Sequence, residues 1–122
     1  MDGIKKQFRS FGYAFRGIYR SLATQVHLQF HALASCLVVL LAWYLGVSAL
    51  EWCVLVLTIA AVWAAEIINT AIEHLTDLVS PNYHPLAERT KDAAAGAVLV
   101  LAIGAVVVAG IIFLPKIWLI IW

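Results

Sequence analysis

The sequence predicts an all-α integral membrane protein with three transmembrane helices and an N-terminal amphipathic surface helix. Three observations support this prediction: 64% of the 122 residues are hydrophobic, the mean hydropathy is +0.94, and the apolar residues gather in three long segments. In soluble domains only about half of the residues are apolar. We therefore interpret residues 1–122 as a single membrane domain.

Residues 1–24 are predicted to form an amphipathic interfacial helix. Apolar residues recur there at spacings of three and four, and basic residues fill other positions. The apolar set is Ile4, Phe8, Phe11, Phe15, Ile18 and Leu22, and the basic set is Lys5, Lys6, Arg9, Arg16 and Arg20. A helix of this kind lies in the membrane interface, with its basic side toward anionic lipid.

The first membrane span is predicted at residues 26–47. Its clean apolar run, residues 32–47, is only about 24 Å long at 1.5 Å per residue, so a polar lead-in must supply the inner end. That lead-in contains His27, Gln29 and His31. His27 and His31 are one helical turn apart and could hold a metal ion, but two histidines without a third ligand favour interfacial polar residues.

The second and third spans are predicted at residues 51–79 and 91–113. A short turn at residues 46–49 precedes the second span, and a loop with two prolines at residues 80–85 follows it. Small residues at 93–97 predict that the third span packs closely against another helix.

The distribution of Lys and Arg predicts the orientation in the membrane. Five of the eight basic residues precede the first span, and Arg89 and Lys91 lie between the second and third spans. Because basic residues concentrate in cytoplasmic segments, the N-terminus and the second connection are predicted to be cytoplasmic. The expected location is the bacterial cytoplasmic (inner) membrane, with several passes.

Four polar residues of the second span share one stripe of a helix. At about 100° per residue, Asn69, Glu73 and Asp77 lie within roughly 60° of Glu66. Charged groups at membrane depth cost roughly 2.5–3.5 kcal/mol each, which points to function. One alternative is an interhelical hydrogen-bond seam. Acceptors without nearby donors, however, make a better cation site than a seam.

The depth of this stripe distinguishes an enzyme from a transporter. From Glu51 at the outer interface, Glu66 is roughly 22 Å and Glu73 roughly 33 Å along the helix, compared with a hydrocarbon thickness near 30 Å. A transporter would place its ion site near the midplane. Carboxylates, an amide, Lys91 and a histidine at the cytoplasmic boundary instead suit phosphoryl transfer from a nucleotide to a lipid headgroup. The sequence contains no Gly-rich P-loop.

Several motifs together resemble the prokaryotic diacylglycerol kinase and undecaprenol kinase family. They are Glu66-Ile67-Ile68-Asn69-Thr70-Ala71-Ile72-Glu73, then Asp77, His84-Pro85-Leu86-Ala87 and Lys91-Asp92-Ala93-Ala94-Ala95-Gly96-Ala97-Val98-Leu99. The likeness covers nearly the whole chain, including Gly12-Tyr13 and Gly17 of the N-terminal helix. It implies a homotrimer of three-helix subunits, with an ATP- and Mg²⁺-dependent active site shared between neighbouring subunits.

The resemblance also assigns roles to residues. Glu66 matches the family's catalytic base and Glu73 a metal ligand. The nucleotide-site positions are matched by Tyr13, Asn69, Glu73, Asp77, His84, Lys91 and Asp92.

One segment departs from the family pattern. Gln25 stands where the family has a second metal-binding carboxylate, and of the polar positions that follow only His31 agrees. An amide oxygen can still bind Mg²⁺, so Gln25 stays with Glu73 in the expected metal site, but it contributes no charge. Either metal affinity is reduced, or His27 or a neighbour compensates, or some activity has been lost.

The resulting expectation is an ATP-dependent lipid kinase that phosphorylates a membrane alcohol, without nucleic-acid partners. Undecaprenol is the preferred substrate because the His84-Pro85-Leu86-Ala87 segment and the Ala-Ala-Ala-Gly run look more like the undecaprenol branch. Diacylglycerol is the alternative. A non-catalytic or ion-conducting helical oligomer is the alternative from another class.

Overall fold

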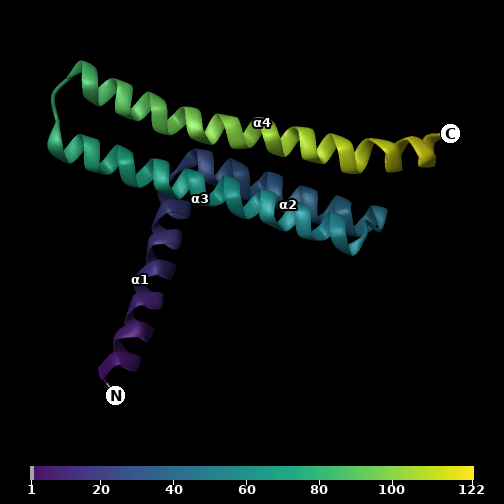
Figure 1. The fold of residues 1–122 in the computed structure, drawn as a ribbon, viewed down its shortest axis with the longest axis horizontal. Helices are drawn as coiled ribbons and strands as arrows, with labels where there is room; N and C mark the ends of the chain where they lie inside the picture. The colour runs from purple at the N-terminus through teal and green to yellow at the C-terminus, as the bar shows by residue number, and fades with distance from the viewer. Residues whose placement is uncertain (1) are drawn as a thin grey trace.

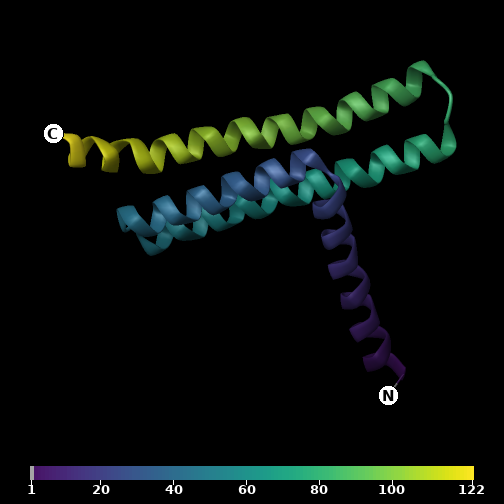
Figure 2. The same cartoon turned by 180° about the vertical axis from the view of Figure 1, so that it is seen from behind.

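The computed structural model describes residues 2–122, which form four helices: α1 (Asp2–Thr24), α2 (Val26–Leu45), α3 (Ala49–Val79) and α4 (Pro85–Ile121). Helices α2, α3 and α4 lie side by side, and α3 and α4 make the most extensive contact. Helix α1 projects away from this bundle at a steep angle (Figure 1), and the view from behind shows the same arrangement (Figure 2). We call the end with residues 80–84 the loop end and the end with residues 46–48 the turn end.

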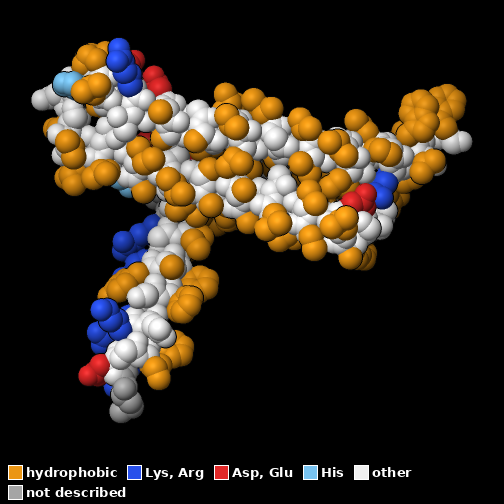
Figure 3. All heavy atoms as spheres, in the orientation of Figure 1, with side chains coloured by type: hydrophobic (Ala, Val, Ile, Leu, Met, Phe, Trp, Pro, Cys, Tyr) orange, Lys and Arg blue, Asp and Glu red, His pale blue; other side chains and the backbone are white. Residues whose placement is uncertain are grey.

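Helices α2, α3 and α4 are each long and apolar enough to cross a membrane. Apolar side chains cover the outside of the bundle along most of its length (Figure 3), and Leu57, Val100 and Ile111 are each at least 70% exposed in the single chain. In a bilayer such faces contact lipid tails or other helices. The structure therefore confirms the predicted class, a three-span membrane protein with a fourth helix.

Helix α1 has the sidedness that the sequence predicts. Figure 3 shows its Lys and Arg side chains along one side and its hydrophobic side chains along the other. Because α1 points away from the three spans at a steep angle, it can lie along the membrane surface while they cross it.

The corner between α1 and α2 is fixed by hydrogen bonds. Gln25 is extended, with φ −103° and ψ 112°, and it separates the two helices. The Gln29 side-chain amide donates to the carbonyl of Leu22 at 3.0 Å. Carbonyls at the end of a helix have no partner within it, so this contact stabilises the end of α1 and sets where α2 begins.

The turn end is closed by two helix caps and an ion pair. Gly46 has φ 63° and ψ 49°, a left-handed conformation that glycine adopts without strain, and it ends α2. Ser48 and Glu51 exchange hydrogen bonds at the start of α3, and Glu51 also pairs with Lys116 of α4 at 3.2 Å. Buried Ala42, Leu55 and Phe113 pack beside these caps.

Helix α4 is longer than the sequence predicts. The expected range was 91–113, but the helix begins at Pro85 and continues through Pro115 to Ile121. A proline inside a helix removes one hydrogen bond and costs about 3 kcal/mol. In apolar surroundings an unwound segment would leave more backbone groups unsatisfied, so the helix continues. Helices α2 and α3 differ from expectation only at their ends, with α2 ending at Leu45 and α3 beginning at Ala49.

Candidate active site

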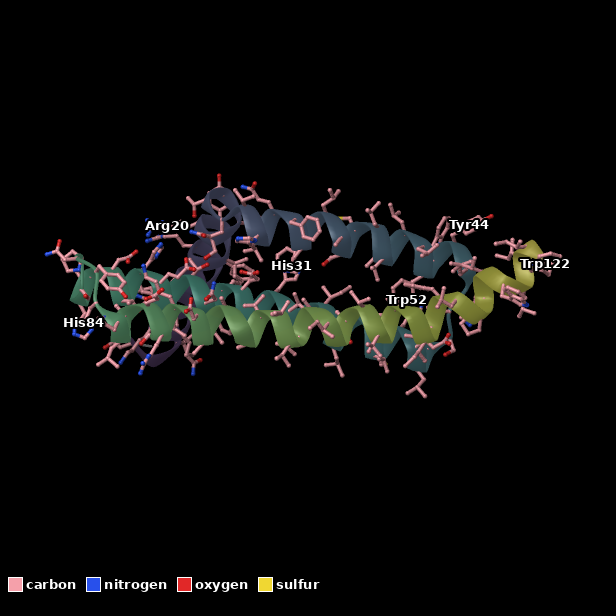
Figure 4. All side chains as sticks on the ribbon, turned by 90° about the horizontal axis from the view of Figure 1, so that it is seen from above. Arg20, His31, Tyr44, Trp52, His84 and Trp122 are labelled. Carbon is pink, nitrogen blue, oxygen red and sulfur yellow. The ribbon has the colours of Figure 1, made fainter. Side chains whose placement is uncertain are left out.

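Two adjoining cavities toward the loop end collect most of the predicted site residues. The first, which we call the acidic cavity, has a volume of about 300 Å³ and is lined by His27, His31, Glu66, Asn69 and Glu73 with apolar residues of α4. The second, the loop cavity, has a volume of about 290 Å³, and its polar residues include Asp77, Tyr83, His84, Glu88, Lys91 and Asp92. Figure 4 shows polar side chains gathered toward the end marked by His84.

Helix α3 connects the two cavities. Glu73 lines the acidic cavity, and Asp77, one helical turn further along α3, lines the loop cavity. The predicted polar stripe is thus present but divided.

Glu66 is the buried carboxylate of the acidic cavity. The residue is only 5% exposed, and its Oε1 lies 3.3 Å from Nε2 of His31 on α2. Thr70, one turn along α3, donates its hydroxyl to the Glu66 carbonyl at 3.0 Å. A buried carboxylate with one neighbouring imidazole and an open cavity beside it can accept a proton from a bound hydroxyl.

Asn69 and Glu73 form the oxygen-rich part of the same cavity. The Asn69 side-chain N–H donates to Glu73 Oε1 at 3.3 Å, which leaves Asn69 Oδ1 buried and without a partner in the described chain. A buried acceptor without a donor is costly, and a cation or a ligand donor would relieve that cost.

Oxygen donors of this kind suit Mg²⁺, which binds through one or two carboxylates and completes its coordination with water and substrate phosphates. Within residues 2–122, no three His, Cys, Asp or Glu side chains are arranged to hold a metal ion. The Glu73 carboxylate and the free Asn69 oxygen therefore fit part of a magnesium site, which the nucleotide phosphates would have to complete.

Helix α4 and the loop before it shape the loop cavity. His84 caps α4 because its Nδ1 accepts the backbone N–H of Leu86 at 3.1 Å. Lys91 on α4 forms an ion pair with Asp77 on α3, so it also links the two helices. Both side chains are partly exposed, so the ion pair lies at the surface of the loop cavity.

Tyr83 and Glu88 belong to the loop cavity although the sequence did not single them out. The Tyr83 hydroxyl donates to Glu88 Oε2 at 2.8 Å, and this hydrogen bond raises the pKa of Tyr83 above its ordinary value. Only the closeness of Tyr83 and Glu88 to His84 in the sequence could have indicated them, because the hydrogen bond between them depends on how the loop folds.

Two predicted residues lie outside both cavities. Tyr13 is 63% exposed on α1, where its ring lies 5.6 Å from the Arg16 guanidinium. Gln25 is the N-cap residue of α2, makes no side-chain cap hydrogen bond, and does not line the acidic cavity. Within one chain these two residues therefore stand apart from Glu66 and Glu73.

Comparison with known proteins identifies relatives over almost the whole chain. The family model described as prokaryotic diacylglycerol kinase matches residues 12–113. The chain is 42% identical over 113 residues to the undecaprenol kinase of Bacillus subtilis (strain 168), covering 93% of this chain and 92% of that protein.

Two further relatives are named diacylglycerol kinase. The protein from a Synechocystis species is 43% identical over 107 residues, covering 87% of this chain and 61% of that protein. The protein from Escherichia coli (strain K12) is 30% identical over 105 residues, covering 86% of each chain.

Proposed function

We propose, because the chain belongs to the prokaryotic diacylglycerol kinase family, that it transfers the γ-phosphate of ATP to the hydroxyl group of undecaprenol. Family membership makes the chain a lipid kinase rather than a non-catalytic or ion-conducting oligomer. The single observation that best supports the reaction is buried Glu66, in a cavity that adjoins the polar loop cavity along α3.

In this proposal the two cavities have different roles. Lys91, Asp92 and His84 hold the nucleotide in the loop cavity, and Glu66 accepts the proton of the lipid hydroxyl as the new O–P bond forms. Glu73 and the free Asn69 oxygen would hold Mg²⁺, which neutralises charge on the transferred phosphoryl group when bound. The apolar wall that α4 contributes suits the chain of a lipid alcohol.

Undecaprenol is supported by the extent of the match to the B. subtilis undecaprenol kinase, which is nearly complete for both chains. Diacylglycerol is the second candidate, favoured by 43% identity to the Synechocystis diacylglycerol kinase.

The test is transfer of radiolabelled phosphate from ATP to each alcohol at equal mole fraction in mixed micelles. We expect kcat/KM for undecaprenol to exceed that for diacylglycerol by at least about tenfold. The opposite ratio would assign diacylglycerol, and transfer to neither would overturn the proposed reaction.

The active enzyme is proposed to be a homotrimer with sites shared between neighbouring subunits. The support is that Tyr13 and Gln25 stand apart from the cavities within one chain, and that large apolar faces of the bundle are exposed. Native mass spectrometry in detergent tests the stoichiometry. Mixing an inactive Glu66→Gln subunit with an inactive Tyr13→Ala subunit tests sharing, because activity returns only if the two residues serve one site from different chains.

The proposed location is the bacterial inner membrane with a cytoplasmic N-terminus. The Lys and Arg of α1 and of the segment after the loop support this orientation, and it places the loop cavity where ATP is available.

In the proposed trimer residue 25 would serve the metal site of a neighbouring subunit, and a carboxylate there is expected to strengthen metal binding. The Gln25→Glu variant should reach half-maximal activity at a several-fold lower magnesium concentration, without a change of lipid substrate, because an added anionic ligand raises divalent-cation affinity. Magnesium titrations of both proteins in the same micelles provide the measurement. An unchanged or higher requirement would mean that the start of α2 is remodelled as a unit, with His27 rather than residue 25 facing Glu73 across the cavity.

A further inference from the structure

The contact between His31 and Glu66 joins two helices inside the acidic cavity. The atoms involved are Nε2 of His31 and Oε1 of Glu66, 3.3 Å apart, and the side chains are 19% and 7% exposed. Figure 4 shows His31 on the side of α2 that faces the other two spans. A titratable imidazole therefore lies beside the carboxylate that the proposed reaction uses as its base, away from bulk solvent.

Hydrogen bonds fix the backbone of α2 at this histidine. The Ser35 hydroxyl donates to the His31 carbonyl at 2.6 Å, and the Trp63 indole N–H donates to Ser35 Oγ at 3.0 Å. Trp63 lies three residues before Glu66 on α3, so the Trp63–Ser35 bond fixes α2 against α3 next to the carboxylate. The position of His31 is thus set by the packing of the helices and not only by its contact with Glu66.

The surroundings make His31 the nearest proton acceptor for Glu66. The other titratable residues of the cavity are His27 on α2 and Glu73 on α3, and the structure shows neither in contact with Glu66. Helix α4 contributes only Ala95, Val98, Leu99 and Ala102, which cannot titrate. Helix α1 contributes no residue to the lining.

We propose that His31, through the lone pair of Nε2, receives the proton which Glu66 takes from the lipid hydroxyl. This inference rests on the proposed function. In the transfer, the lipid O–H bond breaks as its oxygen bonds to the γ-phosphorus, and the bond to ADP breaks with its electrons leaving on ADP. The proton moves first to a Glu66 oxygen and then to the lone pair of His31 Nε2, with the other hydrogen of the ring on Nδ1. His31 finally releases it to water in the cavity.

This arrangement restores the base inside the cavity. As Glu66 loses its proton, the positive charge that forms on the imidazole offsets part of the cost of burying the carboxylate. With His31 at 3.3 Å, the regenerated Glu66 carboxylate is paired with an imidazolium until the proton leaves.

The test is single-turnover phosphate transfer by His31→Gln. Glutamine keeps an N–H donor but cannot accept a proton. We expect the rate of transfer to fall roughly 10- to 100-fold because the proton on Glu66 loses its acceptor, while the lipid concentration that gives the half-maximal rate stays close to wild type. His74→Gln, at a histidine of α3 that lines neither cavity, is the matched control, and its rate should stay close to wild type.

A second measurement tests the pair without relying on activity. The NMR signals of the His31 ring are expected to move in Glu66→Gln relative to the wild type, because the ring loses its contact with a carboxylate, while the signals of the His74 ring stay in place. A transfer rate in His31→Gln that matches the wild type, or His31 signals that are unchanged in Glu66→Gln, overturns the inference. If wild type phosphorylates no lipid alcohol, the proposed function fails, and the NMR comparison still tests the pair.

Discussion

Glu66→Gln is expected to reduce turnover by roughly 10²- to 10⁴-fold while nucleotide binding stays close to wild type. The substitution keeps the size of the side chain and a possible hydrogen bond to His31, but it replaces the carboxylate with an amide, which is too weakly basic to accept the proton. Because Glu66 is buried within the acidic cavity and Asp77 and Lys91 line the separate loop cavity, the nucleotide contacts remain.

The measurement is radiolabelled phosphate transfer under conditions where the chemical step limits the rate, together with nucleotide binding by calorimetry. Glu51→Gln is a matched control, since it removes the same charge at the turn end, where Glu51 pairs with Lys116. Wild-type turnover in Glu66→Gln would show that another group takes the proton.

Glu73→Ala is expected to weaken binding of the metal–nucleotide complex, with activity reduced at least about tenfold at limiting magnesium and partly restored as magnesium rises. The substitution removes a carboxylate and also the acceptor of the Asn69 side-chain N–H, at 3.3 Å. Asn69 then has neither its donor nor its acceptor satisfied within the described chain.

A magnesium titration of activity separates a metal role from a structural one. Glu73→Gln is the comparison variant, because it keeps an oxygen acceptor for Asn69 but removes the charge. If both variants lose activity with an unchanged magnesium dependence, and Glu73→Ala alone lowers the thermal unfolding temperature, Glu73 serves an interhelical hydrogen-bond seam.

The sequence alone determined the features that arise within single helices. The four helices, the loop after Val79 and the common stripe of Glu66, Asn69 and Glu73 follow from apolar length and from 3.6 residues per turn, which depend only on local order along the chain. The expected end at Phe113 was wrong: the helix continues through Pro115 to Ile121, because apolar surroundings favour continued hydrogen bonding.

The tertiary structure decided which side chains from different helices meet. His31 had been interpreted as an interfacial polar residue, and its contact with Glu66 exists only because α2 packs on α3 in the register that the Trp63–Ser35 hydrogen bond marks. The separation of Asp77 from Glu73 into two cavities likewise depends on where α4 and its loop lie. A shift of one turn between neighbouring helices changes every such contact by about 5.4 Å and leaves the periodicity of each sequence segment unchanged.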